Sequence, residues 1–244
     1  EEIGKGAKPF VAAGVLEGAE RVFGLHTAYD LEAGTVGLKP GINNAAVDHF
    51  RIRVHGKSTH VSTPHLGVDA LYIASQIVVA VQGLVTRRTS PTEPVIIGIG
   101  KLNAGTTYNA VAAFAEMEGT TRTISQESRD RVRAQVSETA QSIAALYGGT
   151  AEVEWTDFAA ALVNDPQVCE EAARVVDELL GAGHVVTDRE LSLSGDNFAE
   201  FELYKPGAYA YLGTGNPDLP HTMITNHNGG FDVDENALVT GAGL

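Results

Sequence analysis

The sequence predicts an α/β protein in which an α/β domain, residues 1–42 and 158–244, is interrupted by a βαββαβ insert, residues 43–157. Two observations predict this organisation. Alternating apolar and polar residues, typical of half-buried strands, occur in residues 46–54 and 151–155, and long runs with apolar residues at helical spacing lie between them. After the insert, the chain returns to a helix followed by a strand.

The first 42 residues predict a short apolar helix around Phe10 and a strand over residues 21–25 that ends on His26. Glu1 and Glu2 form an acidic pair that precedes them. An acidic pair at the end of one strand and a histidine at the end of the next are typical of a site at the carboxyl edge of an α/β sheet.

The insert is expected to form one antiparallel sheet covered by two helices. In its first strand Phe50, Ile52 and Val54 share one face, while Arg51 and Arg53 share the other. The expected elements are strand 46–54, helix 69–86, strand 95–99, strand 111–121, helix 126–147 and strand 151–155, with Ser125 as N-cap of the second helix and Gly148 as its stop.

After the insert, the sequence predicts a helix over residues 166–180, because Pro166 suits a first helical turn, and a strand over residues 208–212. Cys169 lies in this helix and is expected to be a small core residue. A polar loop that contains His227 follows the strand.

The loop between the first strand and the first helix of the insert contains Gly-Lys-Ser, which suggests a phosphate-binding loop. Position 51 is Arg where such a loop has its first glycine, so nucleotide binding is not favoured. Two histidines remain on this loop, His60 and His65, separated by Pro64. An isolated pair of this kind is more often two solvent-exposed loop residues than a site.

With 244 residues and 43% hydrophobic residues, the chain has a globular composition. Its formal net charge of −14 argues against nucleic acid or an anionic membrane as partner. No transmembrane helix is expected, and a single cysteine fits a reducing, cytoplasmic compartment. The chain begins without Met or a signal-peptide pattern and ends in a helix-like run, so we expect it to be a fragment of a longer protein.

Glu1, Glu2, His26 and His227 are residue types of a hydrolytic metal site. Of two adjacent glutamates, one can coordinate a metal while its neighbour acts as general base toward the metal-bound water. Spacing alone supports this hypothesis only weakly, because scattered His and Glu residues occur in every protein and are usually unrelated surface groups.

A series of motifs strengthens the hypothesis because it spans nearly the whole chain. In order these are Glu1-Glu2, Phe23-Gly24-Leu25-His26, the Gly-Lys-Ser-Thr-His segment 56–70, Gly105-Thr106-Thr107-Tyr108-Asn109, Glu118-Gly119-Thr120-Thr121-Arg122-Thr123, Ser194-Gly195-Asp196-Asn197-Phe198 and His227-Asn228-Gly229-Gly230-Phe231-Asp232. The series resembles the amidohydrolase branch of the aminoacylase/carboxypeptidase metallopeptidase family. That branch includes hippurate hydrolases, N-acyl amino acid deacylases and aminobenzoyl-glutamate hydrolases.

The resemblance implies a zinc-peptidase-like α/β catalytic domain and a ferredoxin-like satellite domain that pairs two protomers in a homodimer. It implies hydrolysis of the amide bond of N-acyl amino acids or related small amides, with two divalent metal ions per active site of the intact protein (Zn, Mn, Co or Ni). Glu1 would be the general base. Glu2, His26 and His227 would bind the metal ions.

In the satellite domain, the resemblance implies that His60 enters the active site of the partner protomer and stabilises the oxyanion of the tetrahedral intermediate. Asn109 and Arg122 would hold the substrate carboxylate, for which the planar fork of Arg is well suited. His65 also matches a family motif, and a hydrogen-bonding role within the loop is an equal alternative for it.

The chain departs from the family pattern at three places. The family's upstream metal ligands, a His and a bridging Cys or Asp, belong before residue 1. The acidic motif, usually Gly-Ser-Glu-Asp-Phe, contains Asp196 and Asn197 here, so their role is open. Gly229 stands where a proline usually follows the last histidine. A non-catalytic dimerising or ligand-binding protein on the same scaffold is the alternative function.

Overall fold

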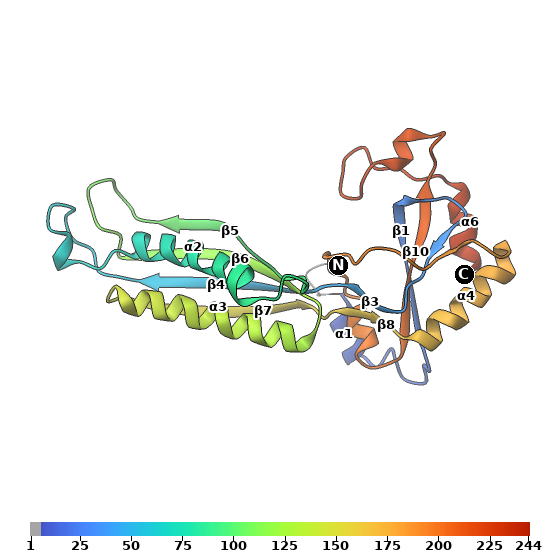
Figure 1. Ribbon diagram of the computed structural model, residues 1–244, viewed down its shortest axis with the longest axis horizontal. Coiled ribbons are helices and arrows are strands. Elements are labelled where there is room, and N and C mark those ends of the chain that lie inside the picture. The colour runs from blue at the N-terminus through green and yellow to red at the C-terminus, as the bar shows by residue number, and fades with distance from the viewer. Residues whose placement is uncertain (1–5) are drawn as a thin grey trace.

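The computed structural model of the protein describes residues 6–244. Two parts lie end to end along the long axis of the molecule (Figure 1). We call residues 46–159 the satellite part, and residues 6–45 with 160–244 the basal part. The predicted domain boundaries at residues 43 and 157 stay predictions.

The satellite part is one antiparallel sheet with two helices packed on one face, so the predicted α/β fold with a βαββαβ unit is confirmed. The sheet order is β5-β6-β4-β7, and each neighbouring pair is antiparallel. Its elements follow in the order β4 (Ala46–His55), α2 (Ala70–Arg88), β5 (Ile96–Ala104), β6 (Phe114–Thr123), α3 (Gln126–Leu146) and β7 (Thr150–Ala159).

Apolar and charged residues alternate along β4, which gives its sheet one apolar face. Phe50, Ile52 and Val54 are each 0% exposed and pack under α2 and α3. Burial of such side chains contributes about 1.5–3 kcal/mol each to stability. Arg51 and Arg53 lie on the opposite, open face, where they pair with glutamates of β6 and β7.

A buried cluster of ion pairs joins α3 to this sheet. Asp48 of β4 is 1% exposed and accepts hydrogen bonds from Arg129 Nε at 2.9 Å and Arg133 Nε at 3.0 Å.

Removing one partner of a buried ion pair leaves the other charge uncompensated. We therefore expect Asp48→Asn to lower the free energy of unfolding by about 3–5 kcal/mol, measured by chemical denaturation. Glu154→Gln is the matched control, because this carboxylate pairs with Arg53 on the open face and is 57% exposed. It should cost about 1 kcal/mol or less, and equal losses in the two variants would contradict the expectation.

The basal part contains a four-stranded sheet in the order β1-β10-β2-β9 and a two-stranded sheet, β3-β8, close to the satellite part. β1 and β10 are parallel neighbours. The strands are β1 (Val22–Glu32), β2 (Val36–Gly37), β3 (Gly41–Asn44), β8 (Leu162–Asn164), β9 (Val185–Val186) and β10 (Gly207–Gly215). The helices are α1 (Ala7–Ala12), α4 (Pro166–Leu180), α5 (Ala199–Glu202) and α6 (Asn236–Gly243), and the short 3₁₀ helices of the chain are η1 (Pro64–Leu66) and η2 (Pro220–Met223).

The predicted strand 21–25 is too short. β1 extends to Glu32, so His26 is the fifth of its 11 residues and not its end. The strand continues because Thr27 and Ala28 pair with Leu212 and Gly213 of β10. This pairing between distant segments cannot be read from the local sequence.

Cys169 is 3% exposed in α4, so its predicted place in the core is confirmed. Burial raises the pKa of its thiol to about 11. The reactive thiolate is therefore scarce at neutral pH.

α2 bears on the expectation of no transmembrane helix, which stays a prediction. Among the residues that the structure describes, α2 is long and apolar enough by length and composition, with 19 residues and a mean hydropathy of 1.3. One face of α2, with Ile73, Ile77 and Val81, packs in the satellite core, as core helices do. The prediction of no membrane partner stays a prediction.

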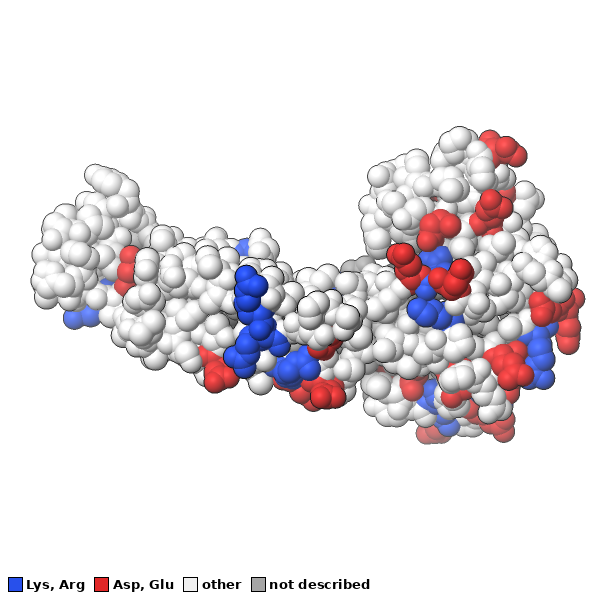
Figure 2. Space-filling view, in the orientation of Figure 1, with Lys and Arg blue, Asp and Glu red and all other residues white. Residues whose placement is uncertain are grey.

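Charged groups are unevenly distributed on the face shown in Figure 2. Acidic side chains gather mainly over the basal part, and one group of basic side chains lies over the middle of the satellite part. A continuous basic surface of the kind that binds nucleic acid is not present on this face. The prediction of no nucleic-acid partner stays a prediction.

A carboxyl group at the end of α5 should make stability depend on pH. Burial raises the pKa of Glu202 from 4.5 to about 7, although Val163 N donates a hydrogen bond to its Oε2 at 2.9 Å. Between these two pKa values the folded state holds a proton that the unfolded state has released, so stability falls as pH rises from about 4.5 to 7.

Glu202→Gln imitates the protonated acid and removes this loss. The stability of the variant relative to the unmodified protein should therefore increase through the same pH window, by at most about 3 kcal/mol. Thermal unfolding of both proteins at a series of pH values measures the difference. Parallel stability curves would show that Glu202 does not carry this pH dependence.

Candidate functional site

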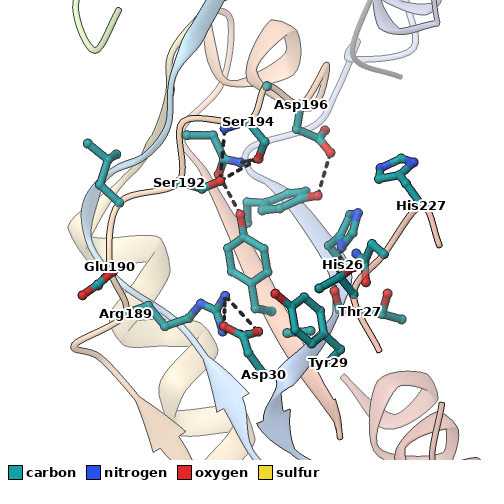
Figure 3. A pocket seen from close by; sticks show the side chains of 18 residues that line it. His26, Thr27, Tyr29, Asp30, Arg189, Glu190, Ser192, Ser194, Asp196 and His227 are labelled. Carbon is teal, nitrogen blue, oxygen red and sulfur yellow. Dashed lines mark hydrogen bonds and ion pairs between the residues drawn. The ribbon is translucent and has the colours of Figure 1, made fainter. Parts of the chain in front are cut away.

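A cavity of about 390 Å³ opens in the basal part. Residues of β1 and β10 form its floor, and residues 189–196 and 225–227 form its walls (Figure 3). These segments are far apart in the sequence. The fold therefore collects polar side chains from distant positions around one cavity.

His26 projects from the middle of β1 into this cavity (Figure 3). Its Nδ1 lies 2.7 Å from the carbonyl oxygen of Thr27. Because a carbonyl oxygen can only accept, Nδ1 carries the proton of the neutral imidazole, and the lone pair is on Nε2. Metal-ligating histidines commonly donate their other ring N–H to a carbonyl in this way. The tautomer of His26 thus suits binding of a cation through Nε2.

His227 reaches the same cavity from the loop 225–227 (Figure 3). Its φ is 61°, and within residues 6–244 it is the one non-glycine residue with a positive φ. Such a backbone conformation costs about 1–3 kcal/mol and gathers at ligand-binding sites, where the surrounding structure holds it in place. The conformation of His227 is a second feature typical of a functional site.

Two of the predicted metal ligands, His26 and His227, therefore line one cavity. Glu2, the third predicted ligand, and Glu1, the predicted base, lie outside the described residues. Within residues 6–244, no three His, Cys, Asp or Glu side chains are grouped so that they could hold a metal ion. Imidazole nitrogens suit metals such as Zn and Ni, and a catalytic zinc normally has three protein ligands. The described residues thus fit part of a metal centre.

Two tyrosines of β10 flank His26 on the cavity floor. The ring centroids of Tyr209 and Tyr211 lie 6.1 and 6.2 Å from that of His26. The Tyr209 hydroxyl donates to Asp196 Oδ2 at 2.7 Å, and the Tyr211 hydroxyl donates to Asn44 Oδ1 at 2.8 Å. Burial raises the pKa of Tyr211, which keeps its hydroxyl protonated. The sequence analysis missed both tyrosines, although their alternate positions in a predicted strand place them on one face.

Arg189 lies at the end of the cavity opposite His227 (Figure 3). Its guanidinium carbon lies 4.4 Å from the ring centroid of Tyr211, and its Nη2 lies 3.2 Å from Asp30 Oδ2. No motif in the sequence pointed to Arg189 or Asp30. Their pairing depends on the fold, since they lie on segments 159 residues apart.

The loop between β4 and α2 and the loop between β5 and β6 lie at the tip of the satellite part, away from the basal part (Figure 1). His60 belongs to the first loop and Asn109 to the second. An antiparallel bridge joins His60 to Ala110, and Val61 N donates to the carbonyl oxygen of Asn109 at 3.2 Å. Within one chain these residues are thus separated from His26 and His227. His65 lies in η1 on the same tip and is exposed, and its predicted role stays a prediction.

The tautomer of His60 is the opposite of that of His26. Ser62 N donates to His60 Nδ1 at 3.2 Å, and Ser62 Oγ lies 2.7 Å from the same nitrogen. A backbone N–H can only donate, so Nδ1 accepts and the proton of the neutral ring is on Nε2. His60 is exposed and therefore presents an N–H donor to its surroundings.

Arg122 lies at the other end of the satellite sheet, beside the cavity wall. Its Nη1 is buried and has no hydrogen-bond partner among the described residues. The same atom lies 3.7 Å from the position that a Cβ on Gly195 would take, and Gly195 lines the cavity. Arg122 and Asn109, which the sequence predicted to share one carboxylate, are thus not together within one chain.

Comparisons with known proteins agree with this organisation. The profile of a peptidase dimerisation domain of the M20 type matches residues 45–147. An N-acetyl-L-cysteine deacetylase of Bacillus subtilis is 36% identical over 239 residues, which are 98% of this chain and 55% of that protein. Thermostable carboxypeptidase 1 of Saccharolobus solfataricus is 34% identical over 97% of this chain and 59% of that protein.

A solved Bacillus subtilis structure, described as a dinuclear metal binding peptidase from the M20 family, has a TM-score of 0.82 and 32% identity. The match covers 100% of this chain and 60% of that chain. The chain thus spans little more than half the length of these relatives.

The basal part is an α/β sheet with a cavity lined in part by His26 and His227, and the satellite part matches a peptidase dimerisation domain. The relatives named as deacetylases and carboxypeptidases match nearly the whole chain. Residues 45–147 match the dimerisation domain of M20 peptidases, and nearly the whole chain is similar to members of that family.

Proposed function

We propose that the intact protein hydrolyses the amide bond of N-acyl amino acids or related small amides, with two divalent metal ions per active site. The observation that carries the proposal is the convergence of His26 and His227, from distant segments, on one cavity in a chain similar to M20 peptidases. The relatives named as deacetylases support the substrate class. The metal would be Zn, Mn, Co or Ni, since imidazole suits Zn and Ni and the carboxylate of Glu2 suits Mn.

Glu2, His26 and His227 would hold the metal. When bound, the metal would polarise the scissile carbonyl and lower the pKa of the attacking water. Glu1 would accept a proton from that water and pass it to the leaving amine. The two adjacent glutamates would divide these tasks, one as metal ligand and the other as general base.

His60 of the partner protomer would donate Nε2–H to the oxyanion of the tetrahedral intermediate. Its tautomer supports this role, because the oxyanion needs a donor and Nδ1 already accepts from Ser62. The distance between the tip and the cavity of one chain supports a contribution in trans. The active site would then be complete only in a homodimer, which agrees with the dimerisation profile over residues 45–147.

The substrate carboxylate would lie between Arg122 of one protomer and Asn109 of its partner, with His65 of the same tip as a further polar group. The buried Nη1 of Arg122 supports this assignment, because a buried cationic N–H without a partner favours an anion beside it. Asn109 lies beside His60 on the same tip, so both would enter the partner's site together. Location in the cytoplasm stays a prediction.

Metal depletion tests the proposal. The protein expressed from its complete coding sequence should hydrolyse members of a panel of N-acyl amino acids, lose this activity after chelation and regain it with Zn, Mn, Co or Ni. Elemental analysis should find two metal ions per protomer. A dimeric protein that binds no metal and hydrolyses no member of the panel would support the non-catalytic alternative instead.

A further inference from the structure

We propose that Asp196, acting through Tyr209, is a positioning residue that holds the imidazole of His26 in its orientation in the cavity. The proposal rests on the function proposed above, in which His26 binds a metal ion. Nothing in the sequence assigned a role to Asp196 or Tyr209. Three observations in the structure connect them to His26.

The first observation is the contact between Tyr209 and His26. Their ring centroids are 6.1 Å apart with an interplanar angle of 45°, which is within the range of aromatic contacts. Tyr209 is 4% exposed and therefore cannot move away without opening the floor of the cavity. Gly24 on β1 makes room for it, since a Cβ there would approach Tyr209 Cδ2 to 2.9 Å and Phe198 to 2.8 Å.

The second observation is the anchor of the Tyr209 hydroxyl. It donates to Asp196 Oδ2 at 2.7 Å (Figure 3). Phe198 N donates to Asp196 Oδ1 at 2.8 Å. Both carboxylate oxygens are thus engaged, and the side chain is held in one orientation. Asp196 is 7% exposed, so these hydrogen bonds are shielded from water, and bonds to a charged acceptor are the stronger ones.

The third observation is that hydrogen bonds hold the backbone just before Asp196 and the backbone of Tyr209. Ala45 N donates to the carbonyl oxygens of Ser192 and Ser194 at 3.1 and 3.2 Å. Tyr209 N donates to Asn164 Oδ1 at 2.8 Å. The backbone at Asp196 and at Tyr209 is therefore held in place. The hydrogen bond between their side chains then limits movement of the Tyr209 ring beside His26.

The experiment compares metal affinity in four variants of the protein expressed from its complete coding sequence. These are Tyr209→Phe, Asp196→Asn, the double variant and Tyr211→Phe. Chelator competition measures the affinity for Zn, and the visible absorption spectrum of the Co-loaded protein reports ligand geometry. Tyr211→Phe is the matched control, because Tyr211 has the same chemistry, lies on the same face of β10 and is anchored to the neutral Asn44 instead.

We expect Tyr209→Phe and Asp196→Asn each to lower metal affinity by about 10-fold, the lower end of the loss seen when a hydrogen-bonded partner of a metal ligand is removed, because Tyr209 contacts His26 through its ring. Both should alter the Co spectrum. The double variant should be no weaker than the single ones, because both remove the same bond. Tyr211→Phe should have the smaller effect. Unchanged affinity in Tyr209→Phe, or additive losses in the double variant, would overturn the proposal.

A second measurement separates this proposal from the proposed function. Nuclear magnetic resonance of the metal-free protein with labelled histidine reports the orientation and tautomer of the His26 ring. Tyr209→Phe should give broadened or additional His26 signals, while Tyr211→Phe should leave them nearly unchanged. If the unmodified protein binds no metal, the proposed function fails while this readout still decides the positioning role. A single unaltered set of His26 signals in Tyr209→Phe would contradict that role.

Discussion

Replacement of Glu1 by Gln should lower turnover by about 10²–10⁴-fold while the protein keeps its metal. Glutamine has the shape of glutamic acid but cannot accept the proton of the attacking water. Since Glu1 is assigned as base and only Glu2 as ligand, the metal content of Glu1→Gln should equal that of the unmodified protein. Steady-state kinetics on an N-acyl amino acid and elemental analysis measure the two quantities.

Glu2→Gln is the matched control for this experiment. It changes the neighbouring residue in the same way, and it should lose metal together with activity, because an amide is a poorer metal ligand than a carboxylate. If Glu1→Gln loses metal as readily as Glu2→Gln, the two roles are reversed. Turnover of Glu1→Gln equal to that of the unmodified protein would remove Glu1 from the mechanism.

His60→Ala should lower turnover by about 10²–10³-fold, the usual effect of losing one donor to the oxyanion. Its melting temperature should change little, because His60 is exposed on a loop and its removal leaves no cavity in the core. Kinetic assays and thermal unfolding measure both effects. His55→Ala is the control, since His55 is an exposed histidine at the end of β4. It should leave turnover unchanged, and an equal loss in both variants would speak against a specific role of His60.

Local patterns predicted the satellite part well because its elements carry their own signals. The alternation of Phe50, Ile52 and Val54 predicted the buried face of β4. Ser125 does cap α3, since its Oγ accepts from Ser128 N at 3.1 Å. Pro166 does begin α4. Each of these signals acts within a few residues, so the sequence alone contains it.

The buried face of α2 was harder to predict. Leu71 is 49% exposed, whereas the equally apolar Ile73 and Ile77 are buried. Because α2 is apolar on nearly all sides, its periodicity does not show which face meets the sheet. Only the position of the sheet decides that.

The candidate site was predictable only where residues match a family motif. His26 and His227 were found in this way, and the cavity brings them together. Tyr209 and Tyr211 were missed because tyrosines in a strand are usually core residues. The separation of Asn109 from Arg122 could not be predicted, since the position of the two ends of the satellite part depends on its packing as a whole.

The shared active site is the central claim of this account, and subunit complementation tests it most directly. An inactive Glu1→Gln protein is mixed with an inactive His60→Ala protein, and subunits are allowed to exchange. In each mixed dimer, one of the two sites combines an intact Glu1 with an intact His60 of the partner chain. With random exchange about half of the dimers are mixed, so activity should return to about a quarter of that of the unmodified protein. A mixture that stays inactive after exchange has been verified would show that His60 acts within its own chain or takes no part in the reaction.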